Sequence, residues 1–322
     1  AAAVAAGGVA DVGGVAAGNH NTANVGATTV TVTGLSLGGA DMANYSINPI
    51  VLNSSITAYP VTVTVTPAQT KVYGTSDPVF TYGSTGLLVG DNFSGALDRV
   101  TGENIGNYAI GQGTLTAGTN YSITFVADNF SITAKPITLT VTPAQTKVFG
   151  SADPVFAYTF NTALIGGDTP TGALARAAGE NIGSYAINQG TVTLGANYTI
   201  TFVADNFTIT AKPITVTPDA GQSKIYNTAD PVFTYTFSPA LINPDVFAGT
   251  LDRVAGANVG TYAYTIGTLS AGSNYSLTLA PAVFTINQAT PIITWSNPSA
   301  IAAGTPLSGT QLNASADVPG VF

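Results

Sequence analysis

Short segments in which apolar residues alternate with Thr or Ser run along most of the chain. Examples are VTVTVT at 61–66, YSITF at 121–125 and ITLTVT at 137–142. A period of two places successive side chains on opposite faces of a strand, and clusters of Gly, Pro, Asn and Asp between the segments favour turns. The pattern predicts an all-β chain of antiparallel modules, Ig-like sandwich or β-grasp-like. A short helix fits only 87–100, where the glycines weaken it.

The chain repeats itself, and the repeat determines the domain organisation. TPAQTKVYGTSDPVFTY from 66 returns as TPAQTKVFGSADPVFAY from 142 and as TPDAGQSKIYNTADPVFTY from 217. GENIGNYAI, GENIGSYAI and GANVGTYAY follow within the three units. We predict three full modules of about 77 residues flanked by two partial ones: a back half at 1–59, repeats at 60–135, 136–212 and 213–288, and a front half at 289–322. The partial modules indicate a piece of a longer polypeptide or a processed product.

The junctions between modules are short. The segment FSITA at 130–134 runs through Lys135-Pro136 into the next alternating segment, and Lys212-Pro213 repeats this arrangement. Proline fixes φ and removes a hydrogen-bond donor, which suits a crossing point between sheets. Without a Gly/Ser linker we expect little hinge freedom and a fairly stiff rod, on the order of 100 Å for three full modules.

These motifs resemble the MBG-type repeats of large bacterial surface proteins. The resemblance is carried by the opening K-V/I-Y/F-G with D-P-x-F-x-Y, by G-E-N-I-G-x-Y-x-I, and by N-Y-x-I-T-F with F-x-I-T-x-K-P-I-T. Residues 23–47 resemble the back half of YDG repeats, and 289–322 the start of a bacterial Ig-like repeat. The resemblance implies secreted, adhesin-like or filamentous-haemagglutinin-like proteins and no enzymatic site. The third unit departs from the pattern at Asn227 and Ala257.

Composition excludes several classes of function. Only 7% of the 322 residues are charged, against about a quarter in ordinary soluble domains. The chain has no Cys and one His, so it lacks the residues for thiolate or His-rich metal sites. Its net charge of −8 repels a nucleic-acid backbone, and no apolar run is long enough to span a membrane. We expect no enzyme, no cofactor and no metal site.

The recurring charges carry two alternative hypotheses. Lys71, Lys147 and Lys224 precede Asp77, Asp153 and Asp230, with Glu103 and Glu180 further on. A buried Lys beside an Asn and a protonated carboxyl would form an autocatalytic Lys–Asn isopeptide bond. The preferred interpretation is that these Lys are solvated charges at strand edges, which discourage edge pairing.

Other recurring residues have a structural interpretation beside the functional one. Gly90 to Asn92, Asp128-Asn129 and Asp205-Asn206 offer oxygen ligands for Ca²⁺, but without an Asp-x-Asp-x-Asp loop we favour Asx-turn hydrogen bonds. The recurring tyrosines are either a sugar-binding platform or core residues. In the core interpretation, one set of tyrosines forms tyrosine corners: Tyr108, Tyr185 and Tyr262. The other set begins strands: Tyr121, Tyr198 and Tyr275.

The remaining candidates are single residues. His20 is expected in a loop and Trp295 in a strand core, and a catalytic triad would have to use that one His. Asn-x-Ser/Thr sequons at Asn53, Asn92 and Asn313, and at the repeated Asn-Tyr and Asn-Phe positions, are compatible with glycosylation or with strand-start chemistry.

Three hypotheses for the function follow. The leading one is an extracellular stalk or shaft of a bacterial surface adhesin or filament, built from tandem modules. The second is a filament or sheath subunit that polymerises head to tail as partial modules complete each other. The third is a carbohydrate- or mucin-binding module. The expected partners are copies of the chain, packed laterally or end to end, or cell-surface glycans. The expected location of the protein is outside the cell or on its surface.

Overall fold

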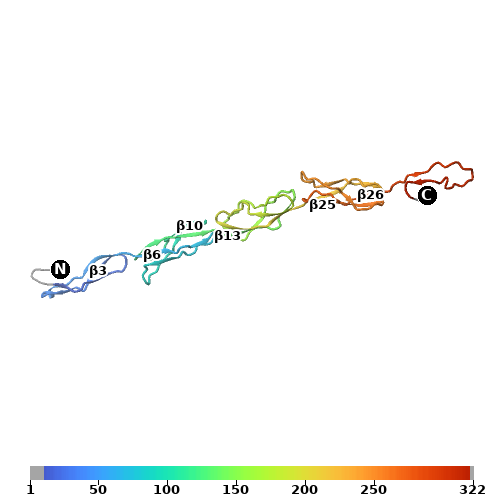
Figure 1. Ribbon diagram of the computed structural model, residues 1–322. Helices are drawn as coiled ribbons and strands as arrows, with labels where there is room; N and C mark the ends of the chain where they lie inside the picture. The colour runs from blue at the N-terminus through green and yellow to red at the C-terminus, as the bar shows by residue number, and fades with distance from the viewer. Residues whose placement is uncertain (1–10, 320–322) are drawn as a thin grey trace. The chain divides into compact units, whose positions relative to one another are not determined.

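The computed structural model describes residues 11–319, and within them the chain is all-β (Figure 1). This confirms the predicted fold class. The described residues contain no α-helix, only the 3₁₀ turn η1 (Met42–Asn44). The stretch at 87–100 forms a loop that ends in the short strand β9 (Asp98–Arg99). Gly90 and Gly95 both have positive φ there, at 98° and 79°, which a helix does not allow.

The strands are short and follow the repeat. The N-terminal partial module contains β1 (Asp11–Gly13), β2 (Ala17–His20), β3 (Gly26–Thr33), β4 (Ser36–Gly38) and β5 (Ile50–Ile56). The first repeat contains β6 (Tyr59–Val65), β7 (Thr70–Val72), β8 (Tyr82–Thr85), β9, β10 (Gly106–Gly111), β11 (Tyr121–Val126) and β12 (Asn129–Thr133).

The second and third repeats contain the same series. The second has β13 (Lys135–Val141), β14 (Thr146–Val148), β15 (Tyr158–Phe160), β16 (Ala175–Arg176), β17 (Gly183–Asn188), β18 (Tyr198–Val203) and β19 (Asn206–Thr210). The third has β20 (Lys212–Pro218), β21 (Ser223–Ile225), β22 (Tyr235–Ser238), β23 (Asp252–Arg253), β24 (Gly260–Thr265), β25 (Tyr275–Leu279) and β26 (Val283–Asn287). The C-terminal partial module has β27 (Ile293–Thr294) and β28 (Ser315–Ala316).

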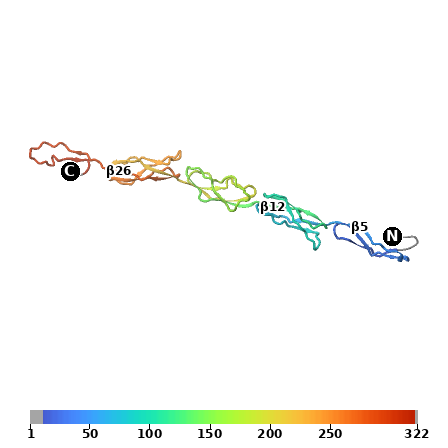
Figure 2. The same ribbon diagram turned by 180° about the vertical axis from the view of Figure 1, so that it is seen from behind.

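The first repeat is a two-layer sandwich of a three-stranded sheet, β11-β6-β8, and a four-stranded sheet, β7-β12-β10-β9 (Figures 1 and 2). The third repeat has the same two sheets. Pairing is mixed, which the expected antiparallel modules did not include: β6 pairs in parallel with β11, and β7 with β12. The long connection between these partners makes parallel pairing possible, because parallel strands need a crossover.

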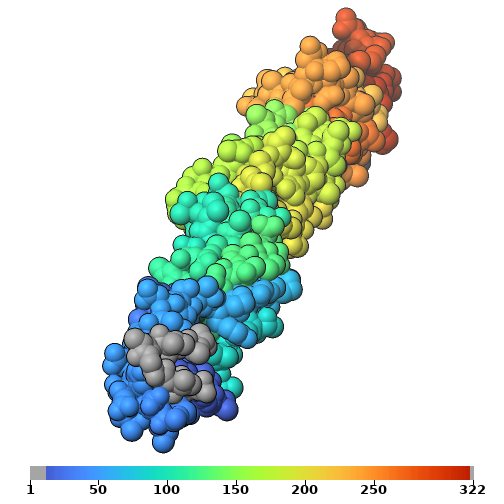
Figure 3. All heavy atoms as spheres, turned by 90° about the vertical axis from the view of Figure 1, so that its left-hand side faces the viewer, coloured from blue at the N-terminus to red at the C-terminus, as the bar shows by residue number. Residues whose placement is uncertain are grey.

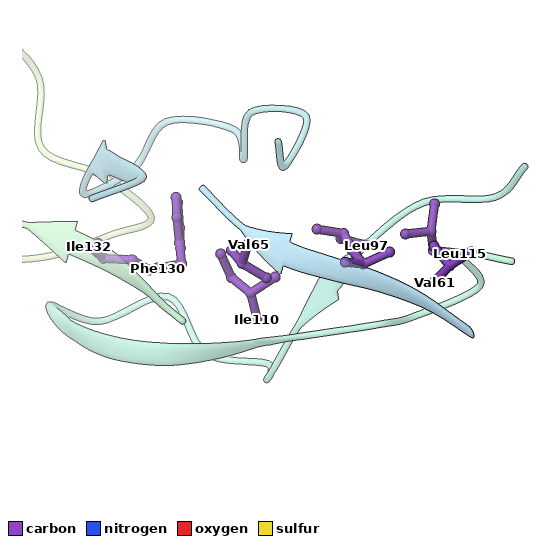
Figure 4. Packing of buried hydrophobic residues seen from close by; sticks show 8 residues of the cluster. Val61, Val65, Leu97, Ile110, Leu115, Phe130 and Ile132 are labelled. Atoms are coloured by element: carbon purple, nitrogen blue, oxygen red, sulfur yellow. The ribbon is translucent and has the colours of Figure 1, made fainter. Parts of the chain in front are cut away.

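The core of the first repeat lies between its sheets. Val61, Val63 and Val65 alternate inward along β6 and are at most 2% exposed. Figure 4 shows Val61 beside Leu115 at one end of the row and Val65 beside Ile110, followed by Phe130. The Phe130 ring packs edge-to-face on Phe80 at 5.1 Å. The alternation in the sequence therefore produces a continuous core between the two sheets. Figure 3 shows the outer surface of the chain, with the first repeat coloured from light blue to green.

Two compact units divide the chain, and the division falls inside the second repeat rather than at a repeat boundary. One unit contains the described residues up to Leu139 with 160–171 and 193–201; the other contains 140–159, 172–192 and the described residues from 202 onward. The junction between the first and second repeats therefore lies in the first unit, and the junction between the second and third repeats lies in the second unit.

Truncation of a core ring tests the role of this packing. We expect Phe130→Ala to destabilise the first repeat by about 3–5 kcal/mol, because Phe130 is fully buried and leaves a cavity. Hydrogen exchange measured by mass spectrometry should accelerate in peptides from 106–133 and stay unchanged in peptides from 260–287. Val79→Ala is the control, since Val79 is 87% exposed and its truncation should change stability by under about 0.5 kcal/mol. Equal effects of the two variants would contradict the assignment of the core.

Candidate functional site

A cluster of four charged side chains lies in the first repeat. Lys71 comes from β7, Asp77 from the loop after it, Arg99 from β9, and Glu103 lies four residues beyond Arg99. Lys71 Nζ lies 2.6 Å from Asp77 Oδ1 and 2.5 Å from Glu103 Oε2. Arg99 Nε donates to Asp77 Oδ2 at 2.6 Å, and Arg99 Nη2 donates to Glu103 Oε1 at 2.6 Å. Two cations and two anions neutralise each other here.

The cations of this cluster are buried. Only 4% of the Lys71 side chain and 6% of the Arg99 side chain are exposed. The guanidinium carbon lies 5.0 Å from the ring centroid of Tyr108 and 5.4 Å from that of Phe130, so it also gains cation–π attraction. Arg99 Nη1 donates to the carbonyl oxygen of Gly102 at 2.6 Å. All five nitrogen-bound hydrogens of a guanidinium need acceptors when buried, and four residues supply them: Asp77, Val100, Gly102 and Glu103.

The cluster recurs in the other two repeats with one loss. In the second repeat Lys147, Asp153, Arg176 and Glu180 make the same contacts, with distances of 2.5–2.6 Å. In the third repeat Lys224 and Arg253 both bind Asp230, at 2.7 and 2.8 Å. Ala257 takes the place of the Glu there, and the Lys side chain is more exposed, at 11%.

The expectation that these Lys are solvated edge charges is therefore wrong for Lys71 and Lys147, which are buried. They lie on short edge strands that pair in parallel with β12 and β19, so their place at a sheet edge is as expected but their side chains are buried instead of solvated. Nor does the geometry favour an isopeptide bond. The Nζ atoms hydrogen-bond to carboxylates rather than to an Asn amide, and amide formation needs a neutral amine and a protonated acid.

Hydrogen bonds from the cations hold the carboxyl groups of the cluster ionised. Arg99, with a further contribution from Lys71, lowers the pKa of Asp77, and Lys71 and Arg99 lower the pKa of Glu103. In the second repeat, hydrogen bonds from Arg176 and Lys147 lower the pKa of Asp153, and hydrogen bonds from Lys147 and Arg176 lower the pKa of Glu180. In the third repeat, Arg253 lowers the pKa of Asp230. In the second repeat an open groove of about 560 Å³ runs beside the cluster. Because the charged groups there already bind each other, the arrangement is suited to holding loops together rather than to catalysis.

The three tyrosine corners predicted from the sequence are confirmed. Tyr108, Tyr185 and Tyr262 donate their hydroxyls to the carbonyl oxygens of Asn104, Asn181 and Asn258, four residues earlier, at 2.7–2.8 Å. Gly102 lies against the Tyr108 ring, where any Cβ would overlap it. The corner therefore fixes the Glu-Asn-Ile-Gly loop that carries Glu103 and ends at β10.

The candidate Ca²⁺ ligands make hydrogen bonds within the protein. Asp91 accepts from the Tyr121 hydroxyl, while Asp128 and Asp205 accept from the backbone N–H of the residue that follows each, at 2.7 Å. The bonds of Asp128 and Asp205 are to the next residue and not two residues on, so they are not the Asx-turn bonds that the sequence predicted. Among residues 11–319 no group of three or more His, Cys, Asp or Glu side chains is placed to hold a metal ion.

A second recurring site lies at the repeat junctions, and it depends on one Asn. Asn197, just before β18, accepts from Ile105 N–H through Oδ1 at 3.0 Å and donates through Nδ2 to Asn104 Oδ1 at 2.9 Å. Its carbonyl oxygen accepts from Lys135 N–H, at the start of β13, at 2.9 Å. One residue thus joins the loop of the first repeat to two strands of the second.

The other junctions repeat this geometry. Asn120 binds Val25 N–H and Asn24, at 2.9 and 3.2 Å. Asn274 binds Ile182 N–H and Asn181, both at 2.9 Å. The carbonyl oxygens of Asn120 and Asn274 accept from Tyr59 and Lys212 N–H at 2.9 Å.

Aromatic contacts complete the two junctions between full repeats. Tyr198 packs edge-to-face on Tyr73 at 5.5 Å, and both hydroxyls donate to Asp168 Oδ2, at 2.8 and 2.9 Å. Tyr275 packs in the same way on Phe149 at 5.5 Å and donates to Asp245 at 2.6 Å. Tyr121, Tyr198 and Tyr275 begin strands, as predicted. Their role at the junctions was missed, although the recurrence of Asn-Tyr in step with Asn-Ile or Asn-Val was a signal for it.

Two single-residue predictions are wrong. His20 is the last residue of strand β2, not a loop residue, because it pairs with Val30 of β3. Trp295 is not in a strand core: it follows β27, is 55% exposed, and donates Nε1–H to the carbonyl oxygen of Gln311 at 2.9 Å. Two strands alone cannot bury a ring of that size. The sequon residues Asn53, Asn92 and Asn313 are exposed.

Comparison with known proteins identifies the repeats. The family model of the MBG domain (YGX type) matches residues 61–131, 137–208 and 214–285. Repeats of this kind are typical of extracellular surface proteins. Comparison with curated proteins and with solved structures gives no match. No helix within residues 11–319 is both long and apolar enough to cross a membrane.

The charge cluster predicts a loss of stability in acid. The cluster carboxylates have folded-state pKa values below the unfolded values of about 3.9 for Asp and 4.3 for Glu. Their ion pairs therefore stabilise the fold above about pH 5 and lose this contribution as the pH falls through the lowered values. Calorimetry should show a thermal midpoint that is constant from pH 7 to about 5 and falls below about 4.

A matched pair of variants assigns the effect to the cluster. Ala257→Glu completes the cluster of the third repeat and should stabilise it by at most about 1 kcal/mol at pH 7, a gain that disappears in acid. Asp98→Asn, at an exposed position outside the cluster, should leave the acid profile unchanged. A wild-type midpoint that does not move on acidification would refute the role of the cluster.

The absence of covalent cross-links has a direct test. We expect the intact mass of the purified chain to equal the mass of its sequence, because the lowered pKa values keep the carboxyl partners of Lys71 and Lys147 ionised. A bond to Asn would remove one ammonia, and a bond to Asp or Glu one water. Lys71→Arg, which is unable to form the bond, gives the reference. Any such mass deficit, absent from the corresponding variant, would show that a bond forms.

Proposed function

The chain belongs to the MBG domain (YGX type) family, and on that premise we propose that it is a structural spacer in the stalk or shaft of a secreted bacterial surface adhesin or filament. In this role the repeats carry no chemistry of their own. They hold some other part of the assembly at a distance from the cell, and their useful properties are length, stiffness and resistance to unfolding.

The observation that carries the proposal is the repeated junction. Only one residue separates β12 from β13, and only one separates β19 from β20. At each of these connections one Asn, Asn197 or Asn274, makes three hydrogen bonds that join the two repeats. A flexible linker would leave neighbouring modules free to rotate. A short connection with directional hydrogen bonds on both sides supports a spacer of limited hinge freedom.

The charge distribution supports the same role. Six of the eight Lys and Arg residues lie in the internal clusters of the repeats. The rest of the surface is rich in Thr, Ser, Asn and Gly. Interactions of these uncharged side chains change little with ionic strength. This suits a spacer exposed to varying salt outside a cell.

Small-angle scattering tests the proposal. A compact globule of 322 residues has a radius of gyration of about 20 Å, whereas a spacer on the order of 100 Å or longer requires a clearly larger value. We expect the larger value for the wild type, and a decrease for the double variant Asn197→Ala/Asn274→Ala, since each change frees one junction. Asn92→Ala, at an exposed loop position, is the matched control. A radius near that of a globule would refute the spacer function.

A further inference from the structure

The charge cluster of the third repeat has one carboxylate fewer than the other two clusters. In the first repeat the two cations share the oxygens of a single Glu. Lys71 Nζ donates to Glu103 Oε2 at 2.5 Å, and Arg99 Nη2 donates to Glu103 Oε1 at 2.6 Å. The carboxylate therefore bridges the two cations with one oxygen on each.

The second repeat has the same bridge. Lys147 Nζ donates to Glu180 Oε2 at 2.5 Å, and Arg176 Nη2 donates to Glu180 Oε1 at 2.6 Å. Two repeats of one chain therefore show which chemical group this pair of cations binds and which cation each oxygen contacts.

In the third repeat the two cations are present without this bridge. Within residues 11–319, Asp230 is the only carboxylate in contact with Lys224 and Arg253, because Ala257 takes the place of the Glu. Asp252 accepts instead from the Arg253 backbone N–H at 2.8 Å. Only 11% of the Lys224 side chain and 7% of the Arg253 side chain are exposed. Two largely buried cations thus share one anion, and a buried charge without a partner is costly.

The groups around Arg253 hold its guanidinium as in the complete clusters. Nη1 donates to the carbonyl oxygens of Val254 and Gly256, at 3.0 and 2.9 Å. The guanidinium carbon lies 4.9 Å from the ring centroid of Tyr262 and 5.4 Å from that of Phe284, nearly the distances found in the first repeat. A carboxylate that binds here meets a cation that is already in position, which lowers the cost of binding.

The position of the second carboxylate can be reached from solvent. The Glu103 and Glu180 side chains are 66% and 68% exposed, although their oxygens contact buried cations. Ala257 is exposed as well, and its side chain ends at Cβ, short of the position of the Glu carboxylate. A ligand can therefore bring a carboxylate to the two cations while the rest of the ligand stays in solvent.

We infer that Lys224 and Arg253 of the third repeat form a binding site for the carboxylate of a small organic acid. One ligand oxygen accepts from Lys224 Nζ and the other from Arg253 Nη2, as the oxygens of Glu103 do in the first repeat. The ligand is a monocarboxylate rather than a polyanion, because the net charge of −8 repels polyanions. A ligand of so few atoms binds weakly, with a dissociation constant roughly in the millimolar range.

Titration with sodium acetate, followed by NMR of the ¹⁵N-labelled chain, tests this site. Near neutral pH, with sodium chloride exchanged for acetate at constant ionic strength, the amide signals of 253–258 should shift and saturate. Ala257→Glu supplies the carboxylate from the chain, as the first two repeats do, and should weaken acetate binding at least about tenfold. Asn53→Asp is the control, since it adds the same charge at an exposed position elsewhere, and it should bind acetate as the wild type does.

A second variant should create the same site in the second repeat. Glu180→Ala removes a largely exposed side chain and leaves Lys147 and Arg176 with one carboxylate, as in the third repeat. We expect this variant to bind a second acetate, with new shifts in the amides of 176–181. Because acetate binds the folded chain, it should also raise the thermal midpoint of this variant more than chloride at the same concentration does.

Glucuronate, whose carboxylate is attached to a sugar ring, distinguishes two sources of the ligand. Competition with acetate would assign the site to acidic sugars as well as to small acids, and failure to compete would assign it to small acids alone. Acetate shifts that do not saturate, or equal acetate binding by the wild type and Ala257→Glu, would overturn the inference. The spacer function does not depend on this site, so its scattering test is unaffected by either result.

Discussion

The need to satisfy the backbone and side-chain groups around one asparagine organises each junction. The loop that ends at β10 presents an N–H and an Asn amide, and the first strand of the next repeat begins with another N–H. Asn197 forms hydrogen bonds with all three of these groups. Asn197 is half-buried, and a polar group of this kind costs free energy when it is left unpaired, so the loop, the strand start and the Asn-Tyr turn stabilise one another. The orientation of the first strand, and of the sheet built on it, depends on that contact.

A second constraint is the scarcity of charge. A chain with 7% charged residues cannot surround a buried cation with many alternative partners, so each repeat brings its few charges to one place. Lys71 and Arg99 share the same two carboxylates, and the rings of Tyr108 and Phe130 cover the guanidinium. Breaking such a group costs more than a surface pair, because a remaining charge would be buried without a partner. The cluster therefore specifies how the loops after β7 and β9 meet.

Much of the fold follows from local pattern and could be predicted, whereas non-local pairing could not. The alternation in residues 61–66 specifies a strand and its inward face, and Gly-x-Tyr after Asn-Ile specifies the tyrosine corner, since both depend on neighbours in sequence. Burial of Lys71 depends instead on the parallel pairing of β7 with β12, some sixty residues away. The same limit applies to the junction Asn and to the mixed sheets. The local pattern around His20 and Trp295 is compatible with either a loop or a strand. Both residues lie in partial modules, where strand pairing differs from that of the full repeats.

The period of the sequence and the unit of structure are offset from each other. The family repeat begins at a first strand such as β6 or β20, but the compact units divide the chain inside the second repeat and leave each junction between full repeats inside one unit. The contact of Tyr73 with Tyr198, and that of Phe149 with Tyr275, are therefore core contacts of a unit rather than an interface between independent domains. It follows that the end of one repeat is incomplete without the start of the next.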